Sequence, residues 1–407
     1  MAAVDAQFYW MSAKLPSDEF LLYAFAGEPA DCTDAIEQVC RRARACPDLS
    51  MRVRDENPLT YPEWVPTVVS QEWVIRHDLD DQGWQGCLAA VAGLAGDQVD
   101  VRRMPWRLHV FGPVPGVPGV GPGTVVVMQI AHALADGARA SAMAAWLFGR
   151  AEPVPAVKRL GAGFLPWRAV QAARAHRRLV RDTRVGLVAP GLGSRPLQPT
   201  NARPGGARWM RTLVRRRSQL PGPTVTVGVL AAVSTALSDL LGDTAESLGA
   251  EVPMAKPDAP HANNHFGNVV VGLYPELGLD ARYQRIATDL ANGRRRFEHP
   301  ATRAADRAFA AVPAPLLRWG IAQFDADARP VHVSGNTVVS SVSRGAADLS
   351  FGGAPVVLTA GYPALSPVMG LTHGVHGIGD TVAISVHAAE SAVPDIDAYL
   401  RLLDAAL

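Results

Sequence analysis

Apolar residues in the first third of the chain form short runs that alternate with segments of helical periodicity. Residues 17–27 (SDEFLLYAFAG) and 125–130 (VVVMQI) are apolar runs of strand length. Residues 31–46 place their apolar positions at helical spacing. Prolines and glycines between 112 and 123 predict a flexible connection between two strands. Strands that alternate with helices predict an α/β fold.

The middle of the chain has a different pattern. From residue 152 to 219 prolines and arginines dominate, and this segment reads as a linker with one basic helix at 168–184. Beyond it, 224–241, 281–296 and 395–407 read as helices, and 268–277, 337–343 and 381–389 read as strands. We therefore predict an N-terminal domain over 1–151, a linker over 152–219 and a C-terminal domain over 220–407.

Composition narrows the class of protein. A chain of 407 residues is long enough for two domains, and 48% hydrophobic with 19% charged residues is typical of a globular protein. A formal net charge of +1 argues against nucleic acid as a partner. We expect neither a signal peptide nor a membrane span, hence a cytoplasmic location. The segment Phe164–Arg184 is either a solvated helix or a peripheral contact with a membrane or lipid surface.

Several familiar site patterns are missing or incomplete. The chain has no phosphate-binding GxxxxGK motif and no GxSxG nucleophile motif. His261 and His265 have the spacing of a metal-binding pair, but they lie in a proline-flanked loop without the glutamate of HExxH. The four cysteines show no metal-ligand spacing, so we expect no metal site.

One histidine stands out because of its context. The apolar run 125–130 leads to His132, which is followed by Asp136, Gly137 and an alanine-rich helical segment. A strand end is a position that a substrate cleft can reach, and imidazole is the side chain best suited to take a proton near neutral pH. Asp136 is too far along the turn to share this proton directly, so we expect it to anchor the loop. Gly137 would permit the turn into the helix.

These residues belong to a longer pattern, the HHxxxDG signature, which reads AHALADG here. Further matches are VDAQFYW near the start, RRMPWRLHVF, PTNARPGGARW, TVTVGVLAAVSTALSDLL, VPMAK, HFGNVVVGLYPEL and TVVSSVSRG. Together they resemble the bacterial wax ester synthase/diacylglycerol acyltransferase (WS/DGAT) family of chloramphenicol-acetyltransferase-like acyltransferases. This sequence departs from that pattern at Ala131, where the first histidine is missing, at Thr226-Val227 in place of Asn-Asp, and at Ser341–Arg344 in place of Asn-Val-Pro-Gly.

The resemblance implies two chloramphenicol-acetyltransferase-like α/β sandwich domains with a tunnel between them. His132 would be the general base of an acyl-CoA-dependent O-acyltransferase acting on an alcohol or diacylglycerol, as in triacylglycerol biosynthesis, with Asp136 as the second catalytic-motif residue. Acyl-CoA would be a substrate, and no cofactor is implied. Candidate substrate-binding residues are Gly137, Asn268, Ser340 and Ser341. The departures leave two alternatives open: a carrier-thioester-dependent ester-forming or condensation enzyme, and a non-catalytic lipid-binding or regulatory relative.

Overall fold

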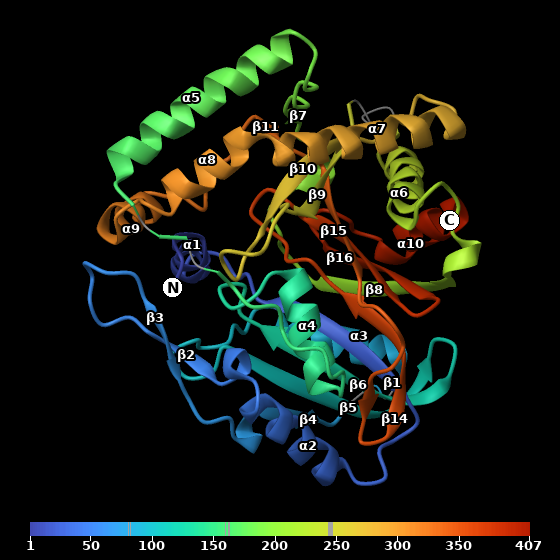
Figure 1. The fold of residues 1–407 in the computed structure, drawn as a ribbon. Coiled ribbons are helices and arrows are strands. Elements are labelled where there is room, and N and C mark those ends of the chain that lie inside the picture. The colour runs from blue at the N-terminus through green and yellow to red at the C-terminus, as the bar shows by residue number, and fades with distance from the viewer. Residues whose placement is uncertain (80, 82, 159, 162, 243–246) are drawn as a thin grey trace.

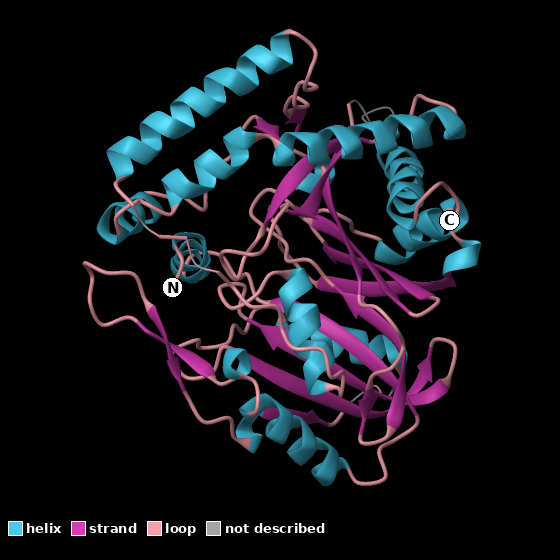
Figure 2. Cartoon of the chain, viewed as in Figure 1, coloured by secondary structure: helices cyan, strands magenta, loops and turns pink. Residues whose placement is uncertain are grey.

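The computed structural model describes residues 1–79, 81, 83–158, 160–161, 163–242 and 247–407. Two six-stranded sheets, one in each lobe, form its framework, and most helices lie on their faces or around them (Figures 1 and 2). The first sheet has the order β13-β14-β1-β6-β5-β4, with bounds Ser350–Phe351, Ala354–Gly361, Glu19–Ala26, Gly121–Ile130, Trp106–Val117 and Val74–His77. The second has the order β10-β9-β12-β15-β16-β8, with bounds Phe266–Gly272, Gly249–Ala255, Thr337–Ser343, Leu371–Ile378, Thr381–Ala389 and Arg208–Arg216. The predicted α/β fold is confirmed.

Strand β1 explains the apolar run near the start of the chain. Leu21, Tyr23 and Phe25 point into a core beneath the helices α2 (Cys32–Arg44) and α4 (Gly137–Leu147). The alternate residues of β1, beginning with Phe20, pack into a second core on the opposite face with the helix α3 (Trp84–Leu94). A strand that is buried on both faces has no polar side to present, so its sequence loses the usual alternation.

The core on the α3 side joins the two lobes. It combines Leu22 and Val127 of the first sheet with Met210 of β8 and Ala383 of β16 in the second. Burial of apolar side chains from both sheets in one cluster favours a fixed arrangement of the lobes. In the second lobe a separate core lies under the helices α6 (Val225–Leu241), α7 (Leu279–Glu298) and α10 (Ile396–Ala406).

Two strands cross the predicted division of the chain. β8 lies inside 152–219, which was predicted as a linker, yet it pairs with β16 over its whole length. Its four arginines and the prolines before it hid the strand pattern. β14 lies in the predicted C-terminal domain but pairs with β1 of the first sheet. The lobes therefore do not coincide with the segments 1–151 and 220–407 at these two places.

The glycine-rich segment 112–123 also differs from its prediction. β5 runs to Val117 and β6 begins at Gly121, so most of the segment belongs to a hairpin and not to a flexible loop. Register shifts interrupt the pairing at Val114 and Val117. Gly116, Gly119 and Gly121 have positive φ angles, which glycine adopts without a steric cost.

The remaining elements surround these sheets. The helix α1 (Ala3–Ser12) lies at the junction of the lobes, and α5 (Leu165–Arg184), α8 (Pro300–Phe309) and α9 (Ala314–Ala322) form a group at one side of the molecule (Figure 1). The short elements are β2 (Met51–Arg54) paired with β3 (Glu63–Pro66), β7 (Arg195–Pro196) paired with β11 (His332–Val333), and single 3₁₀ turns at Pro47–Leu49, Gln71–Trp73, Pro199–Asn201 and Arg217–Gln219. No helix in the described part of the chain is long and apolar enough to cross a membrane.

Candidate active site

His132 lies where the two lobes meet. It follows the end of β6 and enters a tight turn in which the Leu134 amide donates to the carbonyl of Ala131 at 2.8 Å. The imidazole stacks on Phe8 of α1 at a ring-centroid distance of 4.0 Å, and on Phe266 of β10 at 5.7 Å. The ring is thus held between a helix of the N-terminal segment and a strand of the second lobe.

The histidine faces a carboxyl group that sequence reasoning missed. The Nε2 atom of His132 lies 3.6 Å from the Oε1 atom of Glu19, the first residue of β1. Burial, together with the nearby carboxylate of Asp136, raises the pKa of Glu19 to about 8, although the buried guanidinium of Arg344 opposes the shift. Burial lowers the pKa of His132. Near neutral pH the imidazole is therefore unprotonated and can accept a proton, beside a Glu19 that is mostly neutral.

Asp136 anchors the loop, as the sequence predicts, but it does so by hydrogen bonds and not by pairing with an arginine. Its Oδ1 accepts from the Arg139 amide at 2.9 Å and so caps the helix α4. Its Oδ2 accepts from the His265 amide at 2.8 Å. The buried carboxylate of Asp136 thereby joins the loop that carries His132 in the first lobe, the histidine loop, to the segment that leads into β10. The Arg139 guanidinium is paired with Asp48 instead.

A second buried carboxylate reinforces this junction. Asp5 of α1 accepts from the backbone amides of Asn263 and Asn264 at 3.1 and 2.9 Å. The Asn264 side chain donates to Asp5 at 3.0 Å and to the carbonyl of His132 at 2.8 Å. Asp5 and Phe8 are three positions apart and so share a face of α1. This D-x-x-F spacing within VDAQFYW is the one sequence signal that points to both residues.

Ala131, which stands where the family pattern has its first histidine, is buried. Ala131 is 4% exposed and lies in an apolar cluster with Tyr9, Val53 and Val101. This cluster contains Ala131 but not the neighbouring His132. In this protein position 131 is therefore a packing position.

Gly137 has a different role from the predicted one. It is the first residue of α4, and its φ angle is not positive, so the turn itself does not require glycine. A methyl group at this position would lie 3.8 Å from a methyl carbon of Val342 and 4.0 Å from Oε2 of Glu19. Glycine leaves open the space between Glu19 and the strand β12.

Two pockets are lined by residues close to the histidine motif. One, of 430 Å³, is lined by Ser341 and Val342 of β12 and by Thr226 at the start of α6. The other, of 180 Å³, is lined by Phe8, Phe266 and other residues of α1 and its neighbours. The first pocket is lined by Val342, which faces Gly137 of the histidine motif, and the second is lined by Phe8 and Phe266, which both stack on His132.

Of the other predicted substrate-binding residues, some lie at the larger pocket and some lie elsewhere. Ser341 lines the larger pocket, where its hydroxyl lies 2.9 Å from that of Thr226. These two residues stand at two of the positions where the sequence departs from the family pattern, and the structure places them in contact. Ser340 is half-buried in β12 opposite Gly374 of β15. Asn268 does not join the group around His132: its side chain donates to Glu251 of β9 at 2.7 Å, across the sheet edge.

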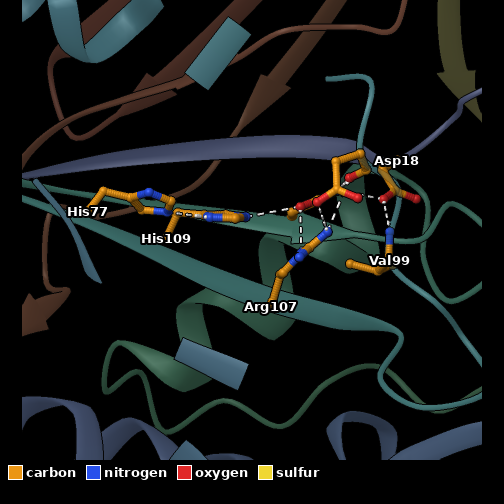
Figure 3. A network of polar contacts seen from close by, with 7 residues as sticks. Asp18, His77, Val99, Arg107 and His109 are labelled. Atoms are coloured by element: carbon orange, nitrogen blue, oxygen red, sulfur yellow. Dashed lines mark hydrogen bonds and ion pairs between the residues drawn. The ribbon is translucent and has the colours of Figure 1, made fainter. Parts of the chain in front are cut away.

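A buried polar network holds the strand ends that carry Glu19 and His132 (Figure 3). Gln129, three residues before His132, donates to Asp18 at 2.7 Å, and Asp18 also accepts from the Val99 amide. The side-chain amide oxygen Oε1 of Gln129 accepts from His109 at 3.0 Å and from Arg107 at 2.9 Å. His77 continues the chain to His109 at 2.8 Å. Buried polar groups that satisfy one another in this way stiffen the surrounding structure.

Comparisons with known proteins agree with this architecture. Residues 262–407 match the family model of the WS/DGAT C-terminal domain. The wax ester synthase/diacylglycerol acyltransferase from Marinobacter aquaeolei VT8 is similar over 99% of this chain and 96% of its own, with 17% identity and a TM-score of 0.63. A mutant starter condensation domain of rhizomide synthetase, in complex with C8-CoA and Leu-SNAC, is similar over 100% of this chain and 93% of its own, with 14% identity and a TM-score of 0.60. No curated protein sequence matches the chain.

The resemblance found in the sequence is thus confirmed by a family match and by the fold. Residues 262–407 match the WS/DGAT C-terminal domain, and the whole chain has the two-lobed, chloramphenicol-acetyltransferase-like fold of the Marinobacter wax ester synthase/diacylglycerol acyltransferase.

Proposed function

We propose that this protein is an acyl-CoA-dependent O-acyltransferase that transfers a fatty acyl group from a thioester to an alcohol or diacylglycerol. The observation that carries the proposal is the position of His132 at the junction of the lobes, stacked on Phe8 and Phe266 of a 180 Å³ pocket, while Gly137 of its motif faces Val342 of a 430 Å³ pocket. We place the acyl donor and the acceptor in these two pockets, so that they would meet at one imidazole. Holding both reactants in place turns a bimolecular encounter into an oriented reaction.

In this proposal the Nε2 atom of His132 takes the acceptor's hydroxyl proton as the oxygen attacks the thioester carbonyl. The carbon–sulfur bond then breaks, and the imidazolium returns the proton to the leaving sulfur, so no cofactor is consumed. Glu19, 3.6 Å from Nε2, is coupled to this step. Glu19 that has already lost its proton to solvent stabilises the imidazolium, and this ionised fraction grows as the pH rises toward the Glu19 pKa of about 8.

The transient oxyanion needs hydrogen-bond donors. The Ser341 hydroxyl, in the pocket that reaches toward His132, is our candidate for this role, with Ser340 as the neighbouring alternative. Asp136 acts through the loop and not on the proton, because both of its oxygens accept backbone amides.

A peripheral contact with a membrane or lipid surface, from the cytoplasmic side, completes the proposal. The helix α5 exposes Phe164 and Trp167 at its start, with exposed fractions of 72% and 54%, and carries arginines along its length. Trp319 of α9 is also exposed. Exposed aromatic residues beside cationic side chains favour the interface of an anionic membrane. Such a surface would supply the apolar acceptor.

Transfer from radiolabelled acyl-CoA to a panel of long-chain alcohols and diacylglycerol tests the proposal. Formation of a labelled ester supports it. Transfer only from a carrier-bound thioester would favour a condensation-type enzyme, a class that the similarity to the rhizomide starter condensation domain keeps open. Binding of the acyl donor without any transfer would favour a lipid-binding relative, which the replaced residues Thr226 and Ser341 keep open.

A further inference from the structure

A buried arginine connects the end of β12 with the first sheet. Arg344 directly follows this strand, and its amide donates to the carbonyl of Gly377 at 2.8 Å. The residue is 5% exposed, and its guanidinium donates to the Thr359 hydroxyl and to the Ala360 carbonyl, both in β14. Position 344 stands where the pattern Asn-Val-Pro-Gly has its glycine, so this cation is a departure from that pattern.

No carboxylate contacts this cation directly. Within the described residues, no carboxylate oxygen lies at ion-pair distance from the Arg344 guanidinium, and its Nε atom has no hydrogen-bond partner. The guanidinium carbon lies 4.8 Å from the centre of the Tyr23 ring. Burial lowers the pKa of Arg344, yet an arginine side chain keeps its proton in a folded protein. A buried cation of this kind favours negative charge in its surroundings.

The sheet register places Glu19 near the guanidinium. Glu19 and Tyr23 lie on one face of β1, because side chains alternate along a strand. Gly361 of β14 pairs with Leu21 on this face, and a methyl group at Gly361 would lie 3.1 Å from an Nη atom of Arg344. Positions 19 and 21 are about 7 Å apart along the strand. Glycine at 361 thus leaves space for the guanidinium on the face that carries Glu19.

Among the charged groups that act on Glu19 within the described residues, Arg344 favours the ionised form. Burial and the carboxylates of Asp136 and Asp18 all favour the protonated form. His132 faces Glu19 at 3.6 Å, but burial lowers the pKa of this imidazole, which is therefore uncharged before proton transfer. Arg344 is thus the group that limits the rise of the Glu19 pKa to about 8.

The other ionisable groups beside Arg344 are neutral or already paired. Burial and the guanidinium itself hold the pKa of His376 well below its usual range. Burial raises the pKa of Tyr23, so its hydroxyl keeps its proton. Arg150 donates to the carbonyl of Arg344 at 2.9 Å, and its own guanidinium is in an ion pair. In the described part of the chain, Glu19 is the neighbour whose charge changes near neutral pH.

We propose that Arg344 is a positioning residue that keeps a fraction of Glu19 ionised beside His132, so that a carboxylate is present when the imidazole takes the acceptor's proton. The role rests on the proposed acyl transfer, in which ionised Glu19 stabilises the imidazolium. Arg344 acts through Glu19 and not on the substrate.

The pH dependence of kcat/KM tests this role. In Arg344→Met the inflection near pH 8, which we assign to Glu19, should move upward by roughly one pH unit, the lower end of the effect of a nearby opposite charge. Because the ionised fraction falls in proportion below the inflection, kcat/KM at pH 7 should fall about tenfold. Arg344→Lys keeps the charge and should keep most of the wild-type profile.

Arg282→Met is the matched control. Arg282 is 8% exposed, and its guanidinium donates to the Tyr274 carbonyl and the Thr235 hydroxyl in the second lobe. Its loss should leave the inflection in place. An unchanged profile in Arg344→Met, or an equal shift in Arg282→Met, would overturn the role. A further tenfold loss when Arg344→Met is added to Glu19→Gln would also overturn it, because the arginine would then act on another group.

Stability gives a readout that needs no turnover. The Glu19 contribution is complete below pH 4.5 and is lost as pH rises through the folded-state pKa of about 8. Arg344→Met should extend the decline in melting temperature to higher pH, and Arg344→Met/Glu19→Gln should not. His376 does not disturb this window, because its lowered pKa affects stability only below about its ordinary 6.5.

The two readouts separate the role of Arg344 from the proposed function. If the decline is extended but no thioester is turned over, the proposed activity is wrong and the action of Arg344 on Glu19 stands. If transfer occurs and neither profile moves in Arg344→Met, the role is wrong and the activity stands.

Discussion

Replacing Asp136 by alanine should destabilise the fold and impair transfer together. The change removes a helix cap, worth about 1 kcal/mol. It also leaves the amide of His265 without its acceptor, which costs roughly 1–3 kcal/mol if that group stays buried. We expect a total loss of roughly 2–4 kcal/mol. In a chain of this length each kcal/mol lowers the melting temperature by roughly 1–3 °C, so the midpoint should fall by several degrees.

The activity should fall by more than the lost stability explains. Without the bond to Asp136, the segment 263–265 keeps the Asn264 bond to the His132 carbonyl but loses the tie next to Phe266, so the stacking of Phe266 on His132 should loosen. Asp136→Asn keeps one acceptor oxygen and should recover part of both properties. Calorimetry and acyl transfer, measured well below the melting temperature, separate the two effects.

Asp395→Ala is the matched control. Asp395 caps α10 by accepting from the Ala398 amide at 2.8 Å, but it makes no contact between the lobes. Its loss should cost about 1 kcal/mol and leave transfer unchanged. If Asp136→Ala melts like Asp395→Ala and keeps full activity, the bridging role of Asp136 is refuted.

Three further outcomes follow from the structure. The folded-state pKa of Glu19, about 8, lies above its ordinary 4.5, so this group stabilises the fold less as pH rises from 4.5 toward 8. Glu19→Gln should therefore flatten the decline in melting temperature over this window and remove an inflection near pH 8 from the kcat/KM profile. Identical profiles for the variant and the wild type would exclude the coupling of Glu19 to His132. Binding to anionic vesicles should weaken at high salt and fall at least severalfold when glutamine replaces the α5 arginines at 174, 177, 178 and 181, whereas unchanged binding would make α5 a solvated helix. Limited digestion with the non-specific protease proteinase K should cut first at the exposed end of α5, near Arg184, and not at the buried Thr200–Asn201, whose side chains bond to the backbone of the second lobe; early cleavage beside Asn201 would contradict this packing.

Elements with strong periodicity could be predicted from the sequence, and elements defined by distant partners could not. β12 and β16 have the predicted bounds, and α6 lies within one residue of its predicted range. β14 was missed because its identity as a strand of the first sheet depends on β1, more than three hundred positions away. β8 was missed because half-buried arginine stems replace the usual apolar alternation.

The candidate site divides in the same way. His132 and Asp136 come from one local motif, so sequence alone identifies them. Glu19 and Asn264 reach the site only through strand pairing and the contact between lobes, and nothing in their local sequence marks them. Asn268 was misplaced for the opposite reason: it lies in a recognisable motif, but its amide is used by its cross-strand neighbour Glu251.

Single-turnover transfer from a radiolabelled acyl thioester, compared between the wild type and His132→Ala, tests the role of His132 most directly. A general base typically contributes 10² to 10⁴ in rate, so the variant should be slower by about that factor. Its affinity for the thioester should be nearly unchanged, because His132 lines neither the 430 Å³ pocket nor the 180 Å³ pocket. Full transfer by His132→Ala on an acceptor that the wild type uses would contradict the proposed mechanism.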